Sequence, residues 1–449
     1  MVIGMELRAQ NYNTAEQYLN DVPKFTTKNP LEATKRFYQY LLSDQAATEI
    51  KEEKLGAVIH VAGTNGKGSV CAYLEAICRE SGYHVGMFTS PHLITTRERF
   101  RIDGEMVSEE DFVEAFNWLS EQIDTYHGIC ADYQPTYFER LFFMMLYLFC
   151  KAGVDVTVLE TGLGGRLDTT NVVAHPAVTV ITEIGMDHMA YLGNTLEAIA
   201  SEKAGIIKQG VPLVYFDKRP ETSVVFEQKA LEVGADCYKV SKNAYKINEI
   251  QKKYIDFSVC SRYYGYIGLQ AQTTAAYQAE NAAIAVHAAE VLAKSADLDR
   301  IDEKSIRLGI AHMHWAGRME EILPDVYIDG AHNEDGIMAF IESVKQSKPK
   351  KPVIVLFSAV NDKKYDKMIQ MLTEVDCIDQ FCITQIPGSR GVKIEELAKQ
   401  FQMNTDKPVH DFENITDAYA FCKKERGEHG TLYIVGSLYL AGLAEDILK

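Results

Sequence analysis

The sequence predicts an α/β fold in two lobes, each built on a mainly parallel sheet covered by helices. Short apolar runs alternate with amphipathic stretches, which is the pattern of strands connected by helices. A polar segment without strand character lies at Ala293–Asp302, and the same alternation starts again after it. We therefore expect a boundary near residue 297, with one domain at 1–297 and a smaller, Rossmann-like α/β domain at 298–449.

The first lobe shows five apolar runs that read as strands and four helical stretches. Ser108 is expected to cap one helix, and Thr136 with Glu139 forms a capping-box pattern ahead of a long apolar run. The expected strands are Leu55–Ala62, His84–Thr89, Val156–Glu160, Val178–Thr182 and Val211–Phe216, and the helices are Ser69–Ser81, one after Ser108, Leu141–Cys150 and Thr195–Lys208.

The second lobe repeats the alternation over a shorter length. Ligands of such folds bind at the carboxyl ends of the strands, and the motifs described below all fall there. The expected strands are Val326–Asp329, Val353–Phe357, Gln380–Thr384 and Leu432–Val435, and the helices are Asn333–Gln346, Ile394–Phe401, Ile415–Lys424 and Ser437–Ile447.

Composition excludes several classes of protein. A formal charge of −17 argues against a general nucleic-acid binder, because phosphate contacts need clustered Lys and Arg. The longest apolar run, Leu141–Cys150, is too short to cross a membrane, and positions 1–30 lack the apolar core of a signal peptide. Nine cysteines without a CxxC pair favour a reduced thiol state. We expect a cytoplasmic protein without nucleic-acid or membrane partners.

Residues 58–69 read VIHVAGTNGKGS, an apolar strand that runs into a glycine-rich turn and then a helix. Glycines let the backbone N–H groups face phosphate oxygens, and the helix N-terminus favours anions. Lys67 can reach the β- and γ-phosphates, and Ser69 can contact a metal ion. The spacing is shorter than in the common P-loop, which would need glycine in place of Val61. A structural turn with an exposed lysine is the alternative. The nucleotide-contacting residues predicted here are Gly63, Thr64, Asn65, Gly66, Lys67, Gly68 and Ser69.

The shortened loop resembles that of the Mur ligase superfamily. Within this superfamily, the motif HVAGTNGKGS is similar to the corresponding motif of folylpolyglutamate and dihydrofolate synthases. The resemblance extends along most of the chain in the family's order. Its fragments are TSPHL at 89–93, RERFRIDG at 97–104, TYFE at 136–139, LETGLGGRLDTTN at 159–171, DH at 187–188, SEKAGI at 201–206, GR at 317–318, DGAHN at 329–333 and GSLYLAG at 436–442.

The resemblance implies ATP and two Mg²⁺ ions, with Ser90, Glu160 and His188 as metal ligands. From local sequence alone, these could be a turn serine, a solvated loop carboxylate and a structural histidine. Imidazole is an unusual ligand for a hard cation. Lys203 would pass for an exposed helix lysine, but SEKAGI matches the position where the family carries a lysine carbamylated by CO₂.

The remaining site residues are also implied by the resemblance. The segment Thr136, Tyr137 and Phe138 would lie beside the pterin, although an aromatic pair there could be plain core. Arg166 and Asp168 would contact the pteroate part. Asn281 would contact adenine, Arg318 the transferring phosphoryl group, and Asp329 the nucleotide, although Asp329 could instead cap a helix. His332, at a helix start, would be a substrate-binding residue, and Ser437 would help to hold the incoming glutamate. A proline that usually precedes the GR pair is replaced by Ala316.

The resemblance implies an ATP-dependent ligase of folate biosynthesis and one-carbon metabolism, and it implies a monomer. Lys67, Lys203, His188 and Arg318 would be its catalytic residues. It would add L-glutamate to folate, dihydropteroate or both, through an acyl phosphate. The alternatives are a P-loop kinase or NTPase switch, another Mur-type amino-acid ligase, and an inactive nucleotide-binding module.

Overall fold

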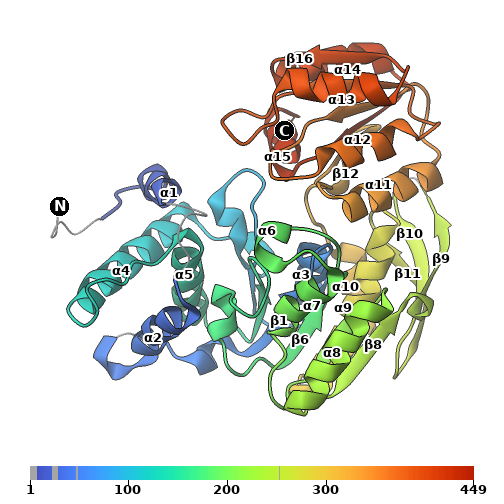
Figure 1. The fold of residues 1–449 in the computed structure, drawn as a ribbon. Helices are drawn as coiled ribbons and strands as arrows, with labels where there is room; N and C mark the ends of the chain where they lie inside the picture. Colours follow the sequence, from blue (N-terminus) through green and yellow to red (C-terminus); the bar gives the residue numbers. More distant parts are fainter. Residues whose placement is uncertain (1–7, 23–28, 47–48, 252, 449) are drawn as a thin grey trace. The chain divides into compact units, whose positions relative to one another are not determined.

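The computed structural model describes residues 8–22, 29–46, 49–251 and 253–448. Contacts divide the chain into two units made of interleaved segments (Figure 1). The boundary expected near residue 297 stays a prediction, because the contact units are not two consecutive stretches. Unit 1 is Met1–Ile184, Thr195–Ser241 and Ile284–Ile310, and unit 2 is Gly185–Asn194, Lys242–Ala283 and Ala311–Lys449.

Unit 1 is built on an eight-stranded sheet in the order β4-β3-β2-β5-β1-β6-β7-β8. The strands from β2 to β8 in this order run parallel, and β3 and β4 extend the sheet antiparallel. The sheet is therefore mainly parallel, as predicted. The bounds are β1 Ala57–Ala62, β2 Val85–Phe88, β3 Phe100–Ile102, β4 Glu105–Met106, β5 Val156–Glu160, β6 Val178–Ile181, β7 Leu213–Asp217 and β8 Cys237–Ser241.

Two helices of unit 1, α4 and α5, begin where the sequence places a cap. Ser108 accepts a hydrogen bond from the backbone of Asp111, and Thr136 forms a capping box with Glu139. Both caps were predicted and are confirmed. The bounds are α1 Tyr12–Asp21, α2 Leu31–Leu42, α3 Lys67–Glu80, α4 Glu109–His127, α5 Tyr137–Ala152, α7 Leu196–Ala204 and α8 Pro220–Val233, with 3₁₀ turns η1 Asp44–Ala46, η2 Glu52–Leu55, η3 Thr96–Arg99 and η4 Thr169–Val172.

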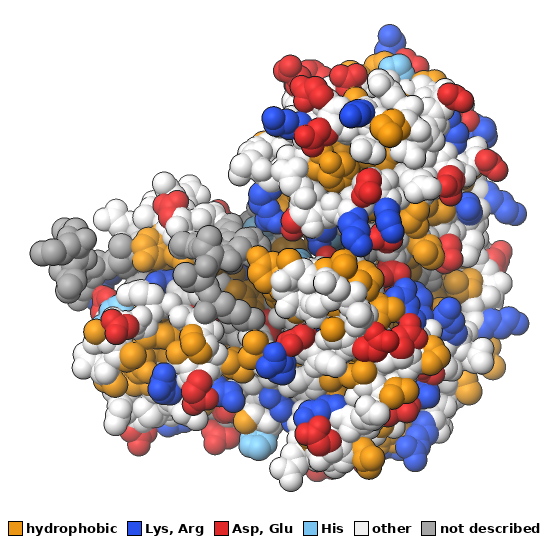
Figure 2. Space-filling model, in the orientation of Figure 1, with side chains coloured by type: hydrophobic (Ala, Val, Ile, Leu, Met, Phe, Trp, Pro, Cys, Tyr) orange, Lys and Arg blue, Asp and Glu red, His pale blue; other side chains and the backbone are white. Residues whose placement is uncertain are grey.

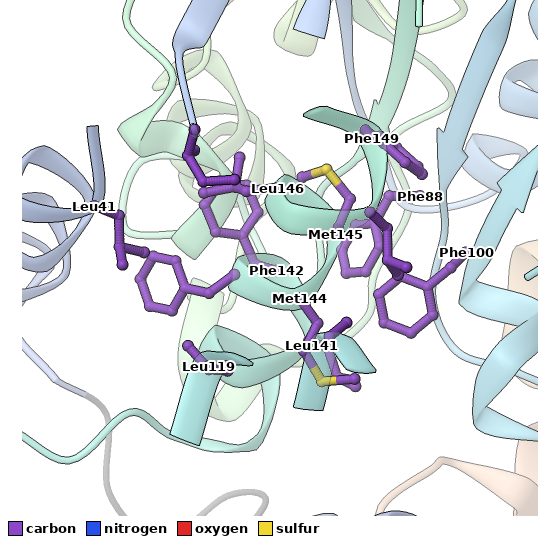
Figure 3. Close-up of a cluster of buried hydrophobic side chains, with 14 of the residues drawn as sticks. Leu41, Phe88, Phe100, Leu119, Leu141, Phe142, Met144, Met145, Leu146 and Phe149 are labelled. Carbon is purple, nitrogen blue, oxygen red and sulfur yellow. The ribbon is translucent and has the colours of Figure 1, made fainter. Parts of the chain in front are cut away.

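The long apolar run of α5 is the centre of a hydrophobic core (Figure 3). Phe142 and Phe143 are fully buried, and side chains from α2, α4, β2 and β3 pack around the helix. No helix in the described part of the chain combines the length and the apolar character that a bilayer-spanning segment needs. Acidic and basic side chains are interspersed on the face shown in Figure 2.

Unit 2 carries a six-stranded sheet in the order β12-β13-β17-β14-β15-β16, in which only β12 pairs antiparallel. A separate antiparallel sheet, β11-β10-β9, was not predicted. The bounds are β9 Tyr245–Ile250, β10 Ile255–Cys260, β11 Gly265–Ala271, β12 Arg318–Leu323, β13 Val326–Asp329, β14 Val353–Phe357, β15 Gln380–Thr384, β16 Val409–Phe412 and β17 Thr431–Val435.

Four helices of the unit 2 sheet, α11, α13, α14 and α15, match the expected positions within a few residues, whereas α12 was not predicted. Two helices, α9 and α10, contain residues of both units, and η5 Lys242–Ala244 opens the segment of the small sheet. The bounds are α6 Met189–Leu192, α9 Tyr277–Ser295, α10 Glu303–His312, α11 Glu334–Ser347, α12 Tyr365–Thr373, α13 Ile394–Asn404, α14 Ile415–Arg426 and α15 Leu438–Leu448.

Candidate nucleotide and substrate site

Four neighbouring parallel strands of unit 1 end at the same edge of the sheet. The strands are β2, β5, β1 and β6 in this order. Ser90 lies shortly after β2, Glu160 ends β5, Gly63 follows β1 and Glu183 lies just after β6. The topology therefore brings the predicted phosphate loop beside two of the three predicted metal ligands.

The glycine turn between β1 and α3 is held tightly against the chain after β6. Gly63 has φ 155°, and a Cβ atom there would lie 1.8 Å from Oγ1 of Thr182. The Thr182 hydroxyl donates to the Asn65 carbonyl at 2.7 Å. The N–H groups of Thr64 and Asn65 both donate to the Glu183 carbonyl, at 2.8 and 3.3 Å. Thr64 and Asn65 are two of the seven predicted nucleotide contacts, and their backbone N–H groups thus donate within the protein.

The first turn of α3 supplies the donors that remain for an anion. Gly66 is the N-cap residue in left-handed conformation, φ 84°, and provides no side-chain cap. The first N–H groups of a helix have no partner within the helix, and the dipole makes this end positive. The Nζ atom of Lys67 lies 3.3 Å from the Thr64 carbonyl and 3.9 Å from Oε1 of Glu160. This cationic turn fits a polyphosphate.

Glu160 is a nearly buried carboxylate, 3% exposed, at the end of β5. Its Oε2 accepts the backbone N–H of Ser90 at 2.9 Å, and the buried Ser69 opens α3 beside the loop. Among the described residues, no group of three or more His, Cys, Asp or Glu is placed to hold a metal ion. One carboxylate with serine hydroxyls still fits Mg²⁺, which keeps waters and takes phosphate oxygens in nucleotide sites.

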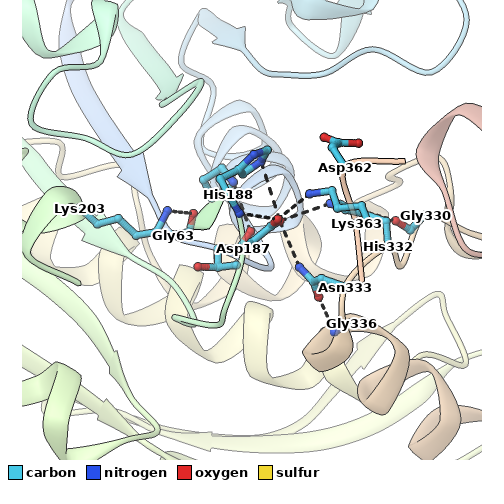
Figure 4. Close-up of polar contacts among 12 residues, drawn as sticks. Gly63, Asp187, His188, Lys203, Gly330, His332, Asn333, Gly336, Asp362 and Lys363 are labelled. Atoms are coloured by element: carbon cyan, nitrogen blue, oxygen red, sulfur yellow. Dashed lines mark hydrogen bonds and ion pairs between the residues drawn. The ribbon is translucent and has the colours of Figure 1, made fainter. Parts of the chain in front are cut away.

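Lys203 is a buried lysine rather than an exposed one. It lies in α7, is 4% exposed, and its Nζ donates to the Gly63 carbonyl at 2.6 Å (Figure 4). The amine therefore touches the backbone of the phosphate loop.

The loop after β5 is closely packed and internally bonded. Gly162 leaves no room for a Cβ atom, which would lie 2.6 Å from the Phe138 ring. Asp168 is buried, and its carboxylate accepts the N–H groups of Leu163 and Thr170. Arg166 is exposed and forms an ion pair with Glu202 at 2.7 Å. The hydrogen bonds of Asp168 stay within its own loop, so its predicted role toward a substrate remains a prediction.

The segment Thr136–Phe138 lies at the start of α5, where its side chains cap the helix and pack in the core. Thr136 caps α5. Tyr137 is buried under the guanidinium of Arg99, whose Cζ lies 5.7 Å from the ring centroid. Phe138 packs on Phe88 at 5.8 Å. All three side chains support the first turn of α5, and a contact with a pterin stays a prediction.

In unit 2, Asp187 is the centre of a network that the sequence did not single out (Figure 4). Its Oδ1 accepts Nζ of Lys363 at 2.5 Å and the backbone N–H of His188 at 2.8 Å. Its Oδ2 accepts Nδ2 of Asn333 at 3.3 Å and lies 3.6 Å from Nε2 of His332. Burial would raise the pKa of Asp187, but the hydrogen bond from His332 and the charges of Lys363 and His188 hold it well below its ordinary value.

His188 itself is 38% exposed at the side chain and has a left-handed backbone, φ 49°. It belongs to unit 2, whereas Ser90 and Glu160 belong to unit 1. The grouping of these three residues around a metal ion therefore stays a prediction.

The other predicted residues of unit 2 surround the end of β13. Asp329 is 3% exposed and accepts the Tyr277 hydroxyl at 2.6 Å and the Ala331 N–H at 2.8 Å. Burial raises the pKa of Asp329, although the adjacent Arg318 opposes that shift. Arg318 opens β12, which pairs with Asp329 in register. The hydrogen bond from Tyr277 fastens the start of α9 to Asp329.

Three predicted residues of unit 2 have local hydrogen bonds. Asn281 donates to Gln278 within α9 at 3.0 Å. Nδ1 of His332 donates to the Gly330 carbonyl at 2.8 Å. Ser437 is buried, and its hydroxyl accepts the Tyr439 N–H at 3.1 Å at the start of α15. Their contacts with adenine or glutamate stay predictions.

Comparison with known proteins decides the family. Residues 61–289 match the Mur ligase middle domain, and residues 317–438 match the Mur ligase glutamate ligase domain. The chain is 36% identical over 404 residues to the dihydrofolate synthase/folylpolyglutamate synthase of Bacillus subtilis, covering 89% of this chain and 91% of that protein. The chain belongs to the Mur ligase family. Within it, the folylpolyglutamate synthase of Lacticaseibacillus casei is 35% identical over 343 residues, which are 75% of this chain and 78% of that one.

Solved Mur ligase structures share the fold over nearly the whole chain. The apo form of the L. casei folylpolyglutamate synthase superimposes with a TM-score of 0.84 at 28% identity, covering 98% of this chain and 100% of that one. The Escherichia coli FolC structure in complex with DHPP and ADP gives 0.83 at 26% identity, with 98% of each chain covered. The resemblance stated from the sequence motifs is confirmed, and so is the fold class. As a Mur ligase, the chain is a ligase and not a kinase or an NTPase switch.

Proposed function

We propose that this Mur ligase uses ATP to join L-glutamate to the carboxyl group of a folate, of dihydropteroate, or of both. One observation carries the proposal most directly. The uncapped N-terminus of α3 and Lys67 face the nearly buried carboxylate Glu160 at the end of β5. The names of the B. subtilis and L. casei relatives, and the ADP and DHPP bound to E. coli FolC, support the substrates.

The first step transfers the γ-phosphoryl group to the substrate. A carboxylate oxygen attacks the γ-phosphorus, the bond to the β-phosphate oxygen breaks, and ADP leaves. The transition state needs positioning and charge neutralisation rather than covalent help. Lys67 and the α3 N-terminus supply part of this charge, and Arg318 would supply more. Ser90, Glu160 and His188 would be Mg²⁺ ligands, and a carbamylated Lys203 would bind or orient a second Mg²⁺. The ions neutralise phosphate charge when bound.

The second step forms the amide bond. The neutral amine of glutamate attacks the acyl carbon of the acyl phosphate, inorganic phosphate leaves, and the amine loses a proton. Ser437 is proposed to hold the incoming glutamate, and His332 to bind a substrate. Asn281 and Asp329 are proposed to contact the nucleotide. The pterin would lie beside Thr136, Tyr137 and Phe138, and the pteroate part would contact Arg166 and Asp168. We also propose a monomer that works in the cytoplasm without macromolecular partners.

Lys203 is proposed to act as a carbamate. Its neutral Nζ would attack CO₂, an N–C bond would form and a proton would leave, which turns a cation into an anion beside the Gly63 carbonyl. Lys203→Ala should then abolish turnover, and a small added carboxylate should restore part of it. Full activity of the alanine variant would rule the role out.

The function is tested by ADP release with each acceptor, with and without glutamate. We expect release that requires both L-glutamate and a pteroate or folate acceptor, and that disappears in Lys67→Met. Release without any acceptor would indicate an NTPase. Release with a different amino acid and no folate would indicate another Mur-type ligase.

A further inference from the structure

A fully buried histidine lies in the strand that leads into the phosphate loop. His60 is in β1 and is 0% exposed. Its Nε2 lies 2.8 Å from Oγ1 of Thr170. The Thr170 hydroxyl is itself a donor, because it lies 2.6 Å from Oδ1 of Asp168, a carboxylate oxygen that can only accept. The single hydroxyl hydrogen goes to Asp168, so Nε2 of His60 carries the hydrogen that Thr170 accepts.

The other ring nitrogen of His60, Nδ1, makes no hydrogen bond in the described part of the structure. With the hydrogen on Nε2, Nδ1 is a bare acceptor, and this buried atom has no hydrogen-bond partner among the described residues. Leaving a buried polar atom unpaired destabilises the fold, and an apolar side chain in β1 would avoid that cost. The hydrogen bond to Thr170 is the one contact that an apolar residue could not supply.

The chain of hydrogen bonds continues beyond Asp168 into the loop after β5. Oδ1 of Asp168 also accepts the Thr170 N–H at 3.0 Å, and Oδ2 accepts the Leu163 N–H at 2.7 Å. His60 therefore connects a strand in the middle of the sheet to both ends of the loop at residues 163–170. Lys67 and the α3 N-terminus make none of these hydrogen bonds. The hydrogen-bonded series from His60 therefore reaches the loop at residues 163–170 and not the phosphate turn.

We infer that His60 is a positioning residue, which acts through Thr170 and Asp168 to hold the loop at residues 163–170 in the conformation that binds the carboxylic acid acceptor. The inference rests on the proposed function, because the loop carries Arg166 and Asp168. It assigns no substrate contact to His60 itself. Loss of the Nε2 hydrogen should weaken binding of the acceptor and leave binding of ATP unchanged.

Two pairs of variants separate the hydrogen bond from simple packing. His60→Met removes the donor, while His60→Gln places an amide N–H near the position of Nε2. Thr170→Val removes the hydroxyl, while Thr170→Ser keeps it. The matched control is Thr179→Val, which removes another buried hydroxyl, one that donates to the Pro212 carbonyl from the neighbouring strand β6.

Steady-state kinetics of glutamate-dependent ADP release is the readout. We expect KM for the acceptor to rise about tenfold in His60→Met and in Thr170→Val, with KM for ATP within about twofold of wild type. The Gln and Ser variants and Thr179→Val should keep the wild-type KM for the acceptor. The double variant His60→Met/Thr170→Val should be no worse than either single one, because both changes break the same connection.

Hydrogen–deuterium exchange gives a second readout that needs no activity. Amides at 163–170 should exchange faster in His60→Met and in Thr170→Val than in wild type. The inference is overturned if KM for acceptor and ATP rise together, if neither changes, or if exchange in the loop is unaltered. Should His60→Met fail to fold, Thr170→Val against Thr170→Ser decides. Absence of glutamate-dependent release in wild type would refute the proposed function alone, and exchange would still test the loop.

Discussion

The Nζ atom of Lys363 lies 2.5 Å from Oδ1 of Asp187, and each side chain is 9% exposed. The two residues are far apart in the sequence and belong to the same unit. Such a pair gives little net stability when intact, because both ions lose their hydration. Removal of the lysine leaves the nearly buried charge of Asp187 without its closest cation, although Asn333 and the His188 N–H still contact it. The pair fixes the short segment Gly185–Asn194 to the loop between β14 and α12.

Lys363→Met should reduce the free energy of unfolding by about 3–5 kcal/mol, because Asp187 would remain charged and nearly buried. Urea unfolding at neutral pH measures this loss. The control is Lys364→Met. Lys364 follows Lys363 in the sequence, but its side chain is 51% exposed and its ion pair with Glu334 is long, at 3.8 Å. That change should stay below about 1 kcal/mol. The double variant Asp187→Asn/Lys363→Met should recover part of the loss, and additive losses would contradict the pairing.

Gly63→Ala should weaken nucleotide binding and lower the melting temperature together. The new Cβ atom would lie 1.8 Å from Oγ1 of Thr182, so the phosphate turn must move away from β6. Overpacking of this kind costs about 1–3 kcal/mol. Gly265→Ala is the control, because a Cβ atom there meets nothing within 4 Å. Unchanged ATP binding in Gly63→Ala would show that the turn does not hold the phosphates.

Glu160→Gln should slow glutamate-dependent ADP release by about two orders of magnitude, and more Mg²⁺ should be needed for half-maximal rate. The substitution removes the negative charge that faces Lys67 while keeping the shape of the side chain. A MgCl₂ titration of the rate measures the effect. Glu75→Gln is a matched control, since Glu75 is 5% exposed in α3 but bonded to Arg79. An unaltered Mg²⁺ dependence in Glu160→Gln would remove Glu160 from the metal site.

His60 should make the protein less stable in mild acid. Burial first, and the nearby charge of Lys208 second, lower the pKa of His60 to about 3, whereas an unfolded histidine titrates near 6.5. Between these pH values the unfolded state binds the additional proton. The stability is fully present above about pH 6.5 and falls by up to about 1.4 kcal/mol per pH unit as the pH drops toward 3.

Urea unfolding between pH 7 and pH 4.5 tests this linkage. Other groups titrate in the same range, so the informative quantity is the difference between wild type and His60→Gln, which cannot take up the proton. We expect wild type to lose stability faster than the variant as the pH falls. Parallel curves would show that the imidazole is protonated in the folded state.

Most of the central sheets could be predicted from the sequence, and the small sheet could not. Val156–Glu160, Val353–Phe357 and Gln380–Thr384 are strands with the predicted bounds, because each is a short apolar run buried on both faces between polar or turn residues. Tyr245–Ile250 is mostly half-exposed or exposed. One-sided strands of this kind lack a continuous apolar run, so β9, β10 and β11 were missed.

In the candidate site, residues in one continuous motif could be predicted from the sequence, whereas contacts between residues far apart in the sequence could not. The glycine turn, Lys67 and Glu160 are readable because strand, loop and helix follow one another directly. Lys203 looked like an exposed helix lysine, and only the resemblance to Mur ligases pointed to it, since its hydrogen bond joins it to the Gly63 carbonyl, which is distant in the sequence. The bond between Asp187 and Lys363 has no local signal, because each residue is an ordinary loop charge until the chain folds.

The alternation of the chain between its units affects how the protein can be synthesised and divided. During synthesis, the last segment of unit 1 is complete when Ile310 has been added, and the last segment of unit 2 is complete when Lys449 has been added. The strands β9, β10 and β11 therefore leave the ribosome long before the sheet of unit 2 is complete. No single cut yields two whole units, so a split enzyme would need fragments that reassemble rather than domains that fold alone.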